Sequence, residues 1–346
     1  MHMADALLSP VVGGTMWVAA AATMGYCCKK LSQEEKGYKL KNPESMDLQK
    51  KIPLMGVLGA FVFASQMINF TIPGTGSSGH IGGGILLASL LGPEAGFLTI
   101  ASVLLIQCLF FADGGILALG CNMINMGLFA CFIGFPFIYS KILKKGFTPT
   151  KIMVASILAV VISLQLGAFG VVMETTLSGV SELPFSTFVM LMQPIHLAIG
   201  AIEGIMTGLV LVFIYNAKPE LLIGYNGDKH VEGKASIKSI VITLAVVTVL
   251  IGGGLSLYAS SNPDGLEWAI QNVTGSDELE RTNSVNETLG GVQEKVAFLP
   301  DYAFKSDGEN TMGTTVSGVV GSAITLGLCG VIAFGLSKAK KKETNE

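Results

Sequence analysis

The first two residues of the chain could bind a metal ion. The α-amine of Met1, the amide nitrogen between Met1 and His2, and a ring nitrogen of His2 can close adjacent small rings around one cation. Three nitrogen ligands in this arrangement suit a square-planar d-block ion such as Ni²⁺, Cu²⁺ or low-spin Co²⁺. An initiator Met followed by a chance His is the commoner explanation of two residues alone, so the interpretation depends on a fourth ligand.

His80 is the candidate fourth ligand. It lies in the glycine-rich stretch 76–84, where the glycines allow close approach of the backbone. Residues 1–8, extended at about 3.3 Å each, reach roughly 26 Å and could fold back onto this loop. Met1, His2 and His80 would then supply an amine, an amide and two imidazoles. An ordinary polar role for a loop histidine is the alternative.

Two carboxylates are candidates for supporting such a site. Asp5 and Asp113 are both predicted at the membrane surface that holds Met1. Either could hold a ligating imidazole in the tautomer that metal binding requires. The alternative is that Asp5 is solvated and Asp113 caps a turn.

Two ionisable residues fall within an apolar stretch. His196 and Glu203 are about two helical turns apart, so they share one face of the predicted helix 190–215, with Glu203 near its middle. Ionisable groups in a membrane are costly and tend to be functional or paired. The small residues Gly200, Gly204 and Gly208 on the same helix favour a packing and hydrogen-bonding role.

Several other kinds of site are not encoded in recognisable form. There is no phosphate-binding loop of the type found in ATPases and no zinc-protease helix motif. The six cysteines lie in apolar stretches without a C-x-x-C pair, so we expect small buried residues and neither disulfides nor a zinc site. No basic, aromatic-interleaved stretch suggests nucleic acid as a partner.

The composition indicates what must position these residues. Half of the chain is apolar, 14% of its residues are charged, and the mean hydropathy is +0.60. Soluble domains are more polar, so we predict an all-α polytopic integral membrane protein.

The apolar runs predict a seven-segment body followed by a two-helix C-terminal module. Residues 82–111 would form about 45 Å of helix, too long for one crossing of about 30 Å, and Gly92 and Pro93 break the run. The predicted segments are 10–28, 53–69, 82–91, 94–111, 116–139, 151–173, 190–215, 238–259 and 313–337. The acidic, polar loop 260–312 joins the last two. We place the domain boundary in a polar linker, giving domains 1–230 and 231–346.

The lysines predict the orientation. On this map 19 of the 22 basic residues are cytoplasmic, as the positive-inside rule requires. The N-terminus, His80 and the loop 260–312 are then outside, and the C-terminus is cytoplasmic. A row of small residues, Gly56, Ala60 and Ala64, indicates close helix contact within the chain or with a partner.

Ordered motifs through nearly the whole chain resemble one family of transport components. Met1, His2, Asp5 and residues 8–10, together with 79–80, 91–93, 113–115, 119–120 and 196–204, resemble the M-type substrate-capture component of energy-coupling-factor transporters for cobalt and nickel. Residues 262–267 and 300–302, with the closing helix, resemble the small N-type or PDGLE component of the same systems, fused here in one chain.

The resemblance implies a binding protein of a bacterial or archaeal cell membrane. It would work in the lipid bilayer with a transmembrane coupling subunit and two ATPase subunits, which would carry the missing phosphate loop. Metal ligation falls on Met1, His2 and His80, and we take Gly56, Ala60 and Ala64 as a candidate contact with the coupling subunit. The chain departs from the family's common pattern at Met3, Ala4 and Asp113, which leaves the chelate intact and the identity of the metal open.

We therefore predict a component for Co²⁺ or Ni²⁺ uptake, with no cofactor beyond the transported ion and no enzymatic activity of its own. Four nitrogen ligands select against Mg²⁺ and Ca²⁺, which prefer oxygen. One alternative is a stand-alone secondary permease, which would need titratable relays through the membrane. Another is a membrane metalloenzyme, for which four nitrogen ligands leave little room for a substrate.

Overall fold

The computed structural model describes residues 1–38, 48–227, 235–276, 279, 283–304 and 311–343. The predicted boundary at 230 and the residue His230 lie outside the described residues. Among the described residues, six helices are long and apolar enough to cross a membrane, and two further apolar helices are shorter. The prediction of an all-α polytopic membrane protein is confirmed.

A helix occupies most of every predicted apolar segment. The body contains α1 (Pro10–Tyr38), α2 (Leu48–Gln66), α3 (Gly84–Leu91), α4 (Pro93–Phe111), the continuous run of α5 (Leu119–Asn122), the π-helical η2 (Met123–Tyr139) and α6 (Ser140–Leu143), then α7 (Pro149–Ser178) and α8 (Phe185–Ala217). The last two apolar segments are α9 (Ile237–Gly253) and α12 (Thr311–Glu343).

The long apolar run 82–111 is divided as expected. Gly92 adopts φ +87°, which favours glycine, and Pro93 begins α4. With 8 residues, α3 is only about 12 Å long, far short of the roughly 30 Å of a bilayer core. All of its residues are buried, so α3 is an internal half-length helix.

The loops at one end of the bundle are more ordered than the sequence indicates. Residues 70–81 contain an antiparallel hairpin of β1 (Phe70–Ile72) and β2 (Ser77–Gly79). The polar loop 260–312 contains α10 (Gly265–Thr274), α11 (Ser284–Val296) and the short turn η5 (Pro300–Tyr302). These elements provide the surroundings of the N-terminus.

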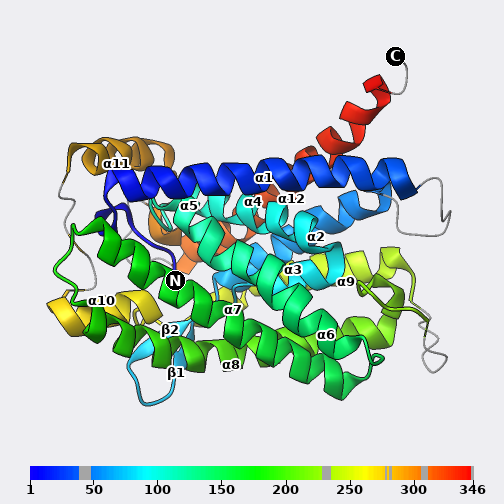
Figure 1. Cartoon of the computed structure of the whole chain (residues 1–346), viewed down its shortest axis with the longest axis horizontal. Helices are drawn as coiled ribbons and strands as arrows, with labels where there is room; N and C mark the ends of the chain where they lie inside the picture. Colours follow the sequence, from blue (N-terminus) through cyan, green and yellow to red (C-terminus); the bar gives the residue numbers. More distant parts are fainter. Residues whose placement is uncertain (39–47, 228–234, 277–278, 280–282, 305–310, 344–346) are drawn as a thin grey trace.

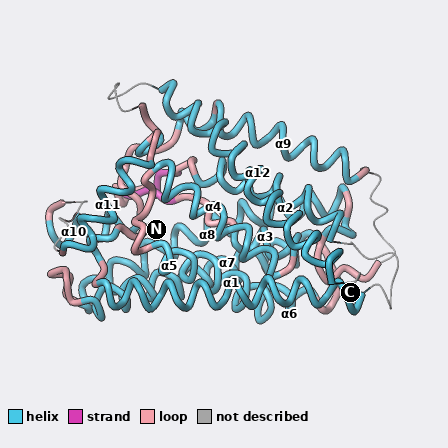
Figure 2. Tube along the Cα trace, turned by 90° about the horizontal axis from the view of Figure 1, so that it is seen from above, coloured by secondary structure: helices cyan, strands magenta, loops and turns pink. Residues whose placement is uncertain are grey.

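The two ends of the bundle differ in content. Figure 1 shows the hairpin, α10 and α11 gathered at the end where the N-terminus lies, with α6 at the opposite end. In the second view α9, α12 and α2 lie on one side, and α1 and α7 run along the other (Figure 2). The first residues of the chain are thus enclosed at one end of the helices.

Small residues fix two helix contacts. The predicted ridge on α8 packs against α7, and a Cβ added at Gly204 would lie 2.6 Å from Ile157 Cα. The row Gly56, Ala60 and Ala64 on α2 packs against α12, where the Ser322 hydroxyl donates to Ala60 O at 3.4 Å. This row therefore packs within the chain in this structure, and its contact with a coupling subunit stays a prediction.

The cysteines behave as small core residues. All six are free, and every one except Cys28 is buried.

Candidate metal centre

The N-terminal segment is buried inside the protein. Met1 is 5% exposed and Met3 is fully buried. Asn122 holds Met3 through both backbone groups: Met3 N donates to Asn122 Oδ1 at 2.8 Å, and Asn122 Nδ2 donates to Met3 O at 3.3 Å. Gly115 N also donates to Met3 O at 2.9 Å. These hydrogen bonds pair the buried N–H and C=O groups of Met3 and fix the position of the backbone.

Asp5 fixes the segment one turn further on. Its Oδ1 accepts a hydrogen bond from Ala118 N at 3.0 Å, within the loop before α5. A Cβ at Gly115 would lie 1.8 Å from the same oxygen, so glycine is required beside it. The structure therefore places Asp5 in the docking of the N-terminal segment.

The Met1 amine lies next to His80. The amine donates to His80 Nε2 over 3.0 Å, while His80 Nδ1 lies 3.4 Å from Ile81 O. Donation of Nδ1–H to this carbonyl leaves the Nε2 lone pair facing the amine. Two nitrogens bound to one metal at about 2.0 Å and at right angles are about 2.8 Å apart. The amine and Nε2 thus have nearly the separation of neighbouring ligands.

The His2 ring lies against the His80 ring. Their centroids are 5.0 Å apart and their planes differ by 15°. His2 Nδ1 lies 3.1 Å from Asp113 Oδ1. Because a six-membered chelate ring with the His2 amide nitrogen must use Nδ1, metal binding and Asp113 compete for this atom in the conformation seen here.

Both imidazoles are held neutral. Burial, reinforced by the positive N-terminus, lowers the pKa of His2 and of His80 to about 3. A metal ion would not compete with protons for either ring near neutral pH.

A fifth group at the site, Asp264, comes from the C-terminal module and was not predicted. The Met1 amine forms an ion pair with Asp264 Oδ2. Burial alone raises the pKa of this carboxyl, but the amine and His80 bring it well below its usual range. Asp264 lies in the stretch 262–267 that carries the family resemblance, yet only the fold brings it to Met1.

The hairpin aligns Asp264 with His80. Ser78 forms a parallel bridge with Asp264, and Ser78 N donates to Pro263 O at 2.8 Å. The module thus pairs with β2 through one isolated bridge at Ser78, close in the chain to His80. Asp264 also caps α10, with Oδ1 accepting from Leu266 N and Glu267 N.

Other side chains of the module hold the surrounding loops. Asn286 Nδ2 donates to Asp5 O at 2.7 Å, and Gln293 Nε2 donates to Gly114 O at 2.6 Å. The Tyr302 hydroxyl donates to Asp113 Oδ2 at 2.5 Å. Burial raises the pKa of Asp113, an effect that the Tyr302 bond opposes. Three elements of the module, α10 with its N-cap, α11 and η5, therefore contact the N-terminal segment or the loop beside it.

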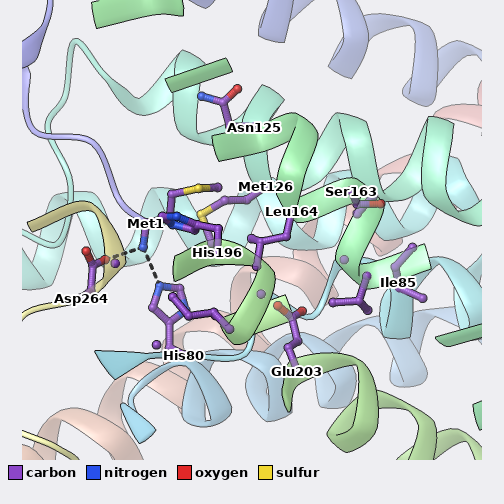
Figure 3. Close-up of a pocket in the computed structure, with 17 residues that line it drawn as sticks. Met1, His80, Ile85, Asn125, Met126, Ser163, Leu164, His196, Glu203 and Asp264 are labelled. Atoms are coloured by element: carbon purple, nitrogen blue, oxygen red, sulfur yellow. Dashed lines mark hydrogen bonds and ion pairs between the residues drawn. The ribbon is translucent and has the colours of Figure 1, made fainter. Parts of the chain in front are cut away.

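A small cavity of about 40 Å³ extends from Met1 into the helices. His196 and Glu203 both line it, and Glu203 Oε1 accepts from Gly83 N at 3.0 Å. Figure 3 shows Met1 between Asp264 and His80, with His196 beside it and Glu203 further along. Within the described residues no cluster of three or more His, Cys, Asp or Glu side chains is arranged to hold a metal. The predicted ligand set of Met1, His2 and His80 is not a cluster of this kind, because two of its four donors are the terminal amine and a backbone amide nitrogen.

The comparison with known families decides what kind of protein this is. Residues 2–221 match the family described as the cobalt uptake substrate-specific transmembrane region, and residues 238–338 match the PDGLE domain. The chain belongs to the cobalt uptake substrate-specific transmembrane family. Its C-terminal third is a PDGLE domain fused to that region.

Relatives of this family member are transport proteins. The chain is 31% identical to an Archaeoglobus fulgidus protein that is named as a fused nickel transport protein. The match covers 95% of this chain and 96% of the relative. A cobalt transport protein of Sorangium cellulosum is 28% identical over 64% of this chain and 94% of its own. A crystal structure described as a truncated transition metal transporter covers 62% of this chain and 98% of its own, at 29% identity and a TM-score of 0.51.

Proposed function

We propose that this chain is the substrate-binding membrane component of an ATP-driven uptake transporter for Ni²⁺ or Co²⁺, and that it captures the ion at the outer face through its N-terminus. Residues 1–230 would form the metal-capture domain, and residues 231–346 would form the module that covers it. The metal is the transported substrate, and ATP would be hydrolysed by two separate ATPase subunits.

The observation that carries the proposal is the meeting of Met1 with His80. The N-terminal amine is buried, 3.0 Å from a neutral imidazole nitrogen, with the His2 ring stacked alongside. Burial of a chain terminus is costly, so a specific use of the amine is favoured. Amine, amide and two imidazoles form a four-nitrogen set that suits Ni²⁺ or low-spin Co²⁺.

The arrangement of charge supports binding outside. The N-terminal segment lies at one end of the bundle, and α6, which contains Lys141 and precedes Lys144, lies at the other (Figure 1). The positive-inside rule would place the basic end in the cytoplasm.

The test is metal analysis of the purified full chain. We expect one equivalent of Ni²⁺ or Co²⁺ in the native protein, and loss of at least tenfold in affinity when one residue is added before Met1, because the amine is then displaced. His2→Ala and His80→Ala should have similar effects. His230→Ala, which changes a histidine of the polar linker in the sequence, is the control. Equal binding by the extended chain would refute the proposal.

A coupling subunit needs a surface, and α1 offers one. Contact at Gly56, Ala60 and Ala64 would require α12 to move away, whereas Ala19, Ala22 and Gly25 are exposed on α1. Small exposed residues permit close helix approach in a membrane.

The α1 contact predicts that Ala22→Trp abolishes uptake in cells that contain the partner subunits while metal binding by the purified chain persists. Leu158→Trp is the control because it enlarges another exposed apolar side chain, on α7. Uptake that continued in cells without the ATPase subunits would instead favour the secondary permease.

A further inference from the structure

His196 carries a free ring nitrogen inside the protein. Its Nδ1 lies 2.8 Å from Met192 O, and donation of Nδ1–H to this carbonyl leaves a lone pair on Nε2. The side chain is 1% exposed, and Nε2 has no hydrogen-bond partner within the described part of the chain. Buried imidazole nitrogens without partners are uncommon, so this one calls for a ligand.

The free nitrogen faces the same small space as the Met1 amine. Met1, His80, His196 and Asp264 all line the cavity (Figure 3). A Cβ at Gly265 would lie 3.0 Å from His196 Cε1 and 3.2 Å from Nε2. Glycine at residue 265 therefore keeps a side chain off this edge of the ring, and the preceding residue, Asp264, lines the same cavity.

His196 and Asp264 do not belong to the four-nitrogen set. The amine, the amide, His2 and His80 already fill a square plane, so a further imidazole and a carboxylate are surplus to it. A cavity of about 40 Å³ holds about three water molecules, enough to keep part of an ion's hydration shell. One nitrogen, one oxygen and water bind a hydrated divalent ion weakly and release it readily, in contrast to a four-nitrogen chelate.

We propose that His196 Nε2 and the Asp264 carboxylate form a transfer position, which takes the incoming hydrated Ni²⁺ or Co²⁺ and passes it to the N-terminal chelate. The position rests on the proposed function, since it has a purpose only beside the chelate. The transfer position gives the PDGLE domain a direct role in metal loading. Asp264 binds the Met1 amine in the metal-free chain and supplies an oxygen ligand when the ion arrives.

The experiment follows the chelation of Ni²⁺ by the full chain in lipid nanodiscs, using the charge-transfer absorption of the four-nitrogen complex after rapid mixing. His196→Gln and Asp264→Asn each remove one donor. Gly265→Ala keeps both donors and places a methyl group against the His196 ring. All three should form the complex at least tenfold more slowly than the native chain, and His196→Gln and Gly265→Ala should reach the same final absorption per protein.

The control for Gly265→Ala is Gly291→Ala on α11, because a Cβ there meets no atom within 4 Å. It should load at the native rate. Unchanged rates in His196→Gln and Gly265→Ala would overturn the proposal. Loss of the final absorption in His196→Gln would also overturn it, because His196 would then belong to the chelate itself.

Failure of the transfer position and failure of the proposed function would give different results in this experiment. If the native chain gave no four-nitrogen absorption, or if the N-terminally extended chain gave the same absorption, the proposed function would fail whatever the rates. If His196→Gln or Asp264→Asn does not fold, Gly265→Ala remains as a test, because its new Cβ meets the flexible end of Ile199 at 2.8 Å as well as the His196 ring.

Discussion

The position of the Met1 amine depends on residues that bind the backbone further along the chain. Asn122 binds both backbone groups of Met3, which fixes the chain two residues beyond the amine. A chelate depends on the geometry of its donors, so such positioning residues contribute to affinity by holding the donors ready.

We predict that Asn122→Ala weakens Ni²⁺ binding roughly 5- to 150-fold, since loss of bonds to a buried backbone costs about 1–3 kcal/mol and each 1.4 kcal/mol is tenfold. Competition with a chromogenic chelator measures the change. Asn272→Ala is the matched control, because Asn272 is exposed and donates only within its own helix. Native affinity in Asn122→Ala would show that Met3 is not held by this contact alone.

The sequence identified the principal candidates and missed their supports. Met1, His2 and His80 could be proposed from donor chemistry, and the structure brings all three together. Asp264 and Asn122 could not, because each meets the N-terminus only through contacts more than 100 residues away in the chain. Glu174 lies one residue beyond the predicted segment 151–173 and was not a candidate, yet it is buried within α7 and accepts from Asn125.

At the scale of helices, the contact between α7 and α8 sets one wall of the cavity. Gly200, Gly204 and Gly208 bring α8 against the α7 backbone, and His196 and Glu203 follow on the same helix. Moving α8 outward would separate His196 from the N-terminal site.

We predict that Gly204→Ala lowers stability by about 1–3 kcal/mol, the usual cost of overpacking, because the new methyl group meets Ile157 Cα at 2.6 Å. Gly291→Ala makes the same change in open space and should stabilise the protein slightly. Thermal unfolding in nanodiscs compares the two. Equal melting temperatures would mean that α7 moves aside without cost.

The apolar runs predicted which segments form helices. They did not predict the secondary structure within the loops. Gly92 and Pro93 predicted the break between α3 and α4. The positive φ that glycine tolerates and the amide proton that proline lacks are properties of single residues, so the sequence alone reveals them. The hairpin at 70–79 and the helices of 260–312 are short and polar, and tertiary contacts such as Ser78 with Pro263 stabilise them. Such contacts leave no periodic pattern in the sequence.

For the whole molecule, the C-terminal module and the body meet around the N-terminal segment. Asn286 donates to Asp5 O and Leu8 O, and Gln293 donates to Gly114 O. These bonds cross from the C-terminal third of the chain to the N-terminal segment and its neighbouring loop.

We predict that Asn286→Ala combined with Gln293→Ala increases hydrogen exchange of the amides in residues 2–8 at least tenfold, because the segment opens more often. Exchange within α7 should stay unchanged. The control is Gln271→Ala, an exposed residue of α10. Unaltered exchange at the N-terminus would show that the module does not hold it.

Metal should bind the folded chain more tightly than the unfolded chain, because His80 joins the three nitrogens of residues 1 and 2 only after folding. We predict that Ni²⁺ at about 100 times its dissociation constant stabilises the native state by up to about 2.7 kcal/mol and raises the melting temperature. A chelator should reverse the shift. The N-terminally extended chain, tested in parallel, should show no shift, and an equal shift there would point to binding elsewhere.

The ion pair between Met1 and Asp264 has a consequence for biosynthesis. Residue 264 leaves the ribosome long after residue 1, and at about 5–20 residues per second the delay is roughly 13–50 s. During that interval the amine has no module to cover it and is open to the enzymes that process new N-termini. Fusion of the module to the body therefore also orders two events. The N-terminus is exposed to processing enzymes first, and the C-terminal module covers it only after it has been synthesised.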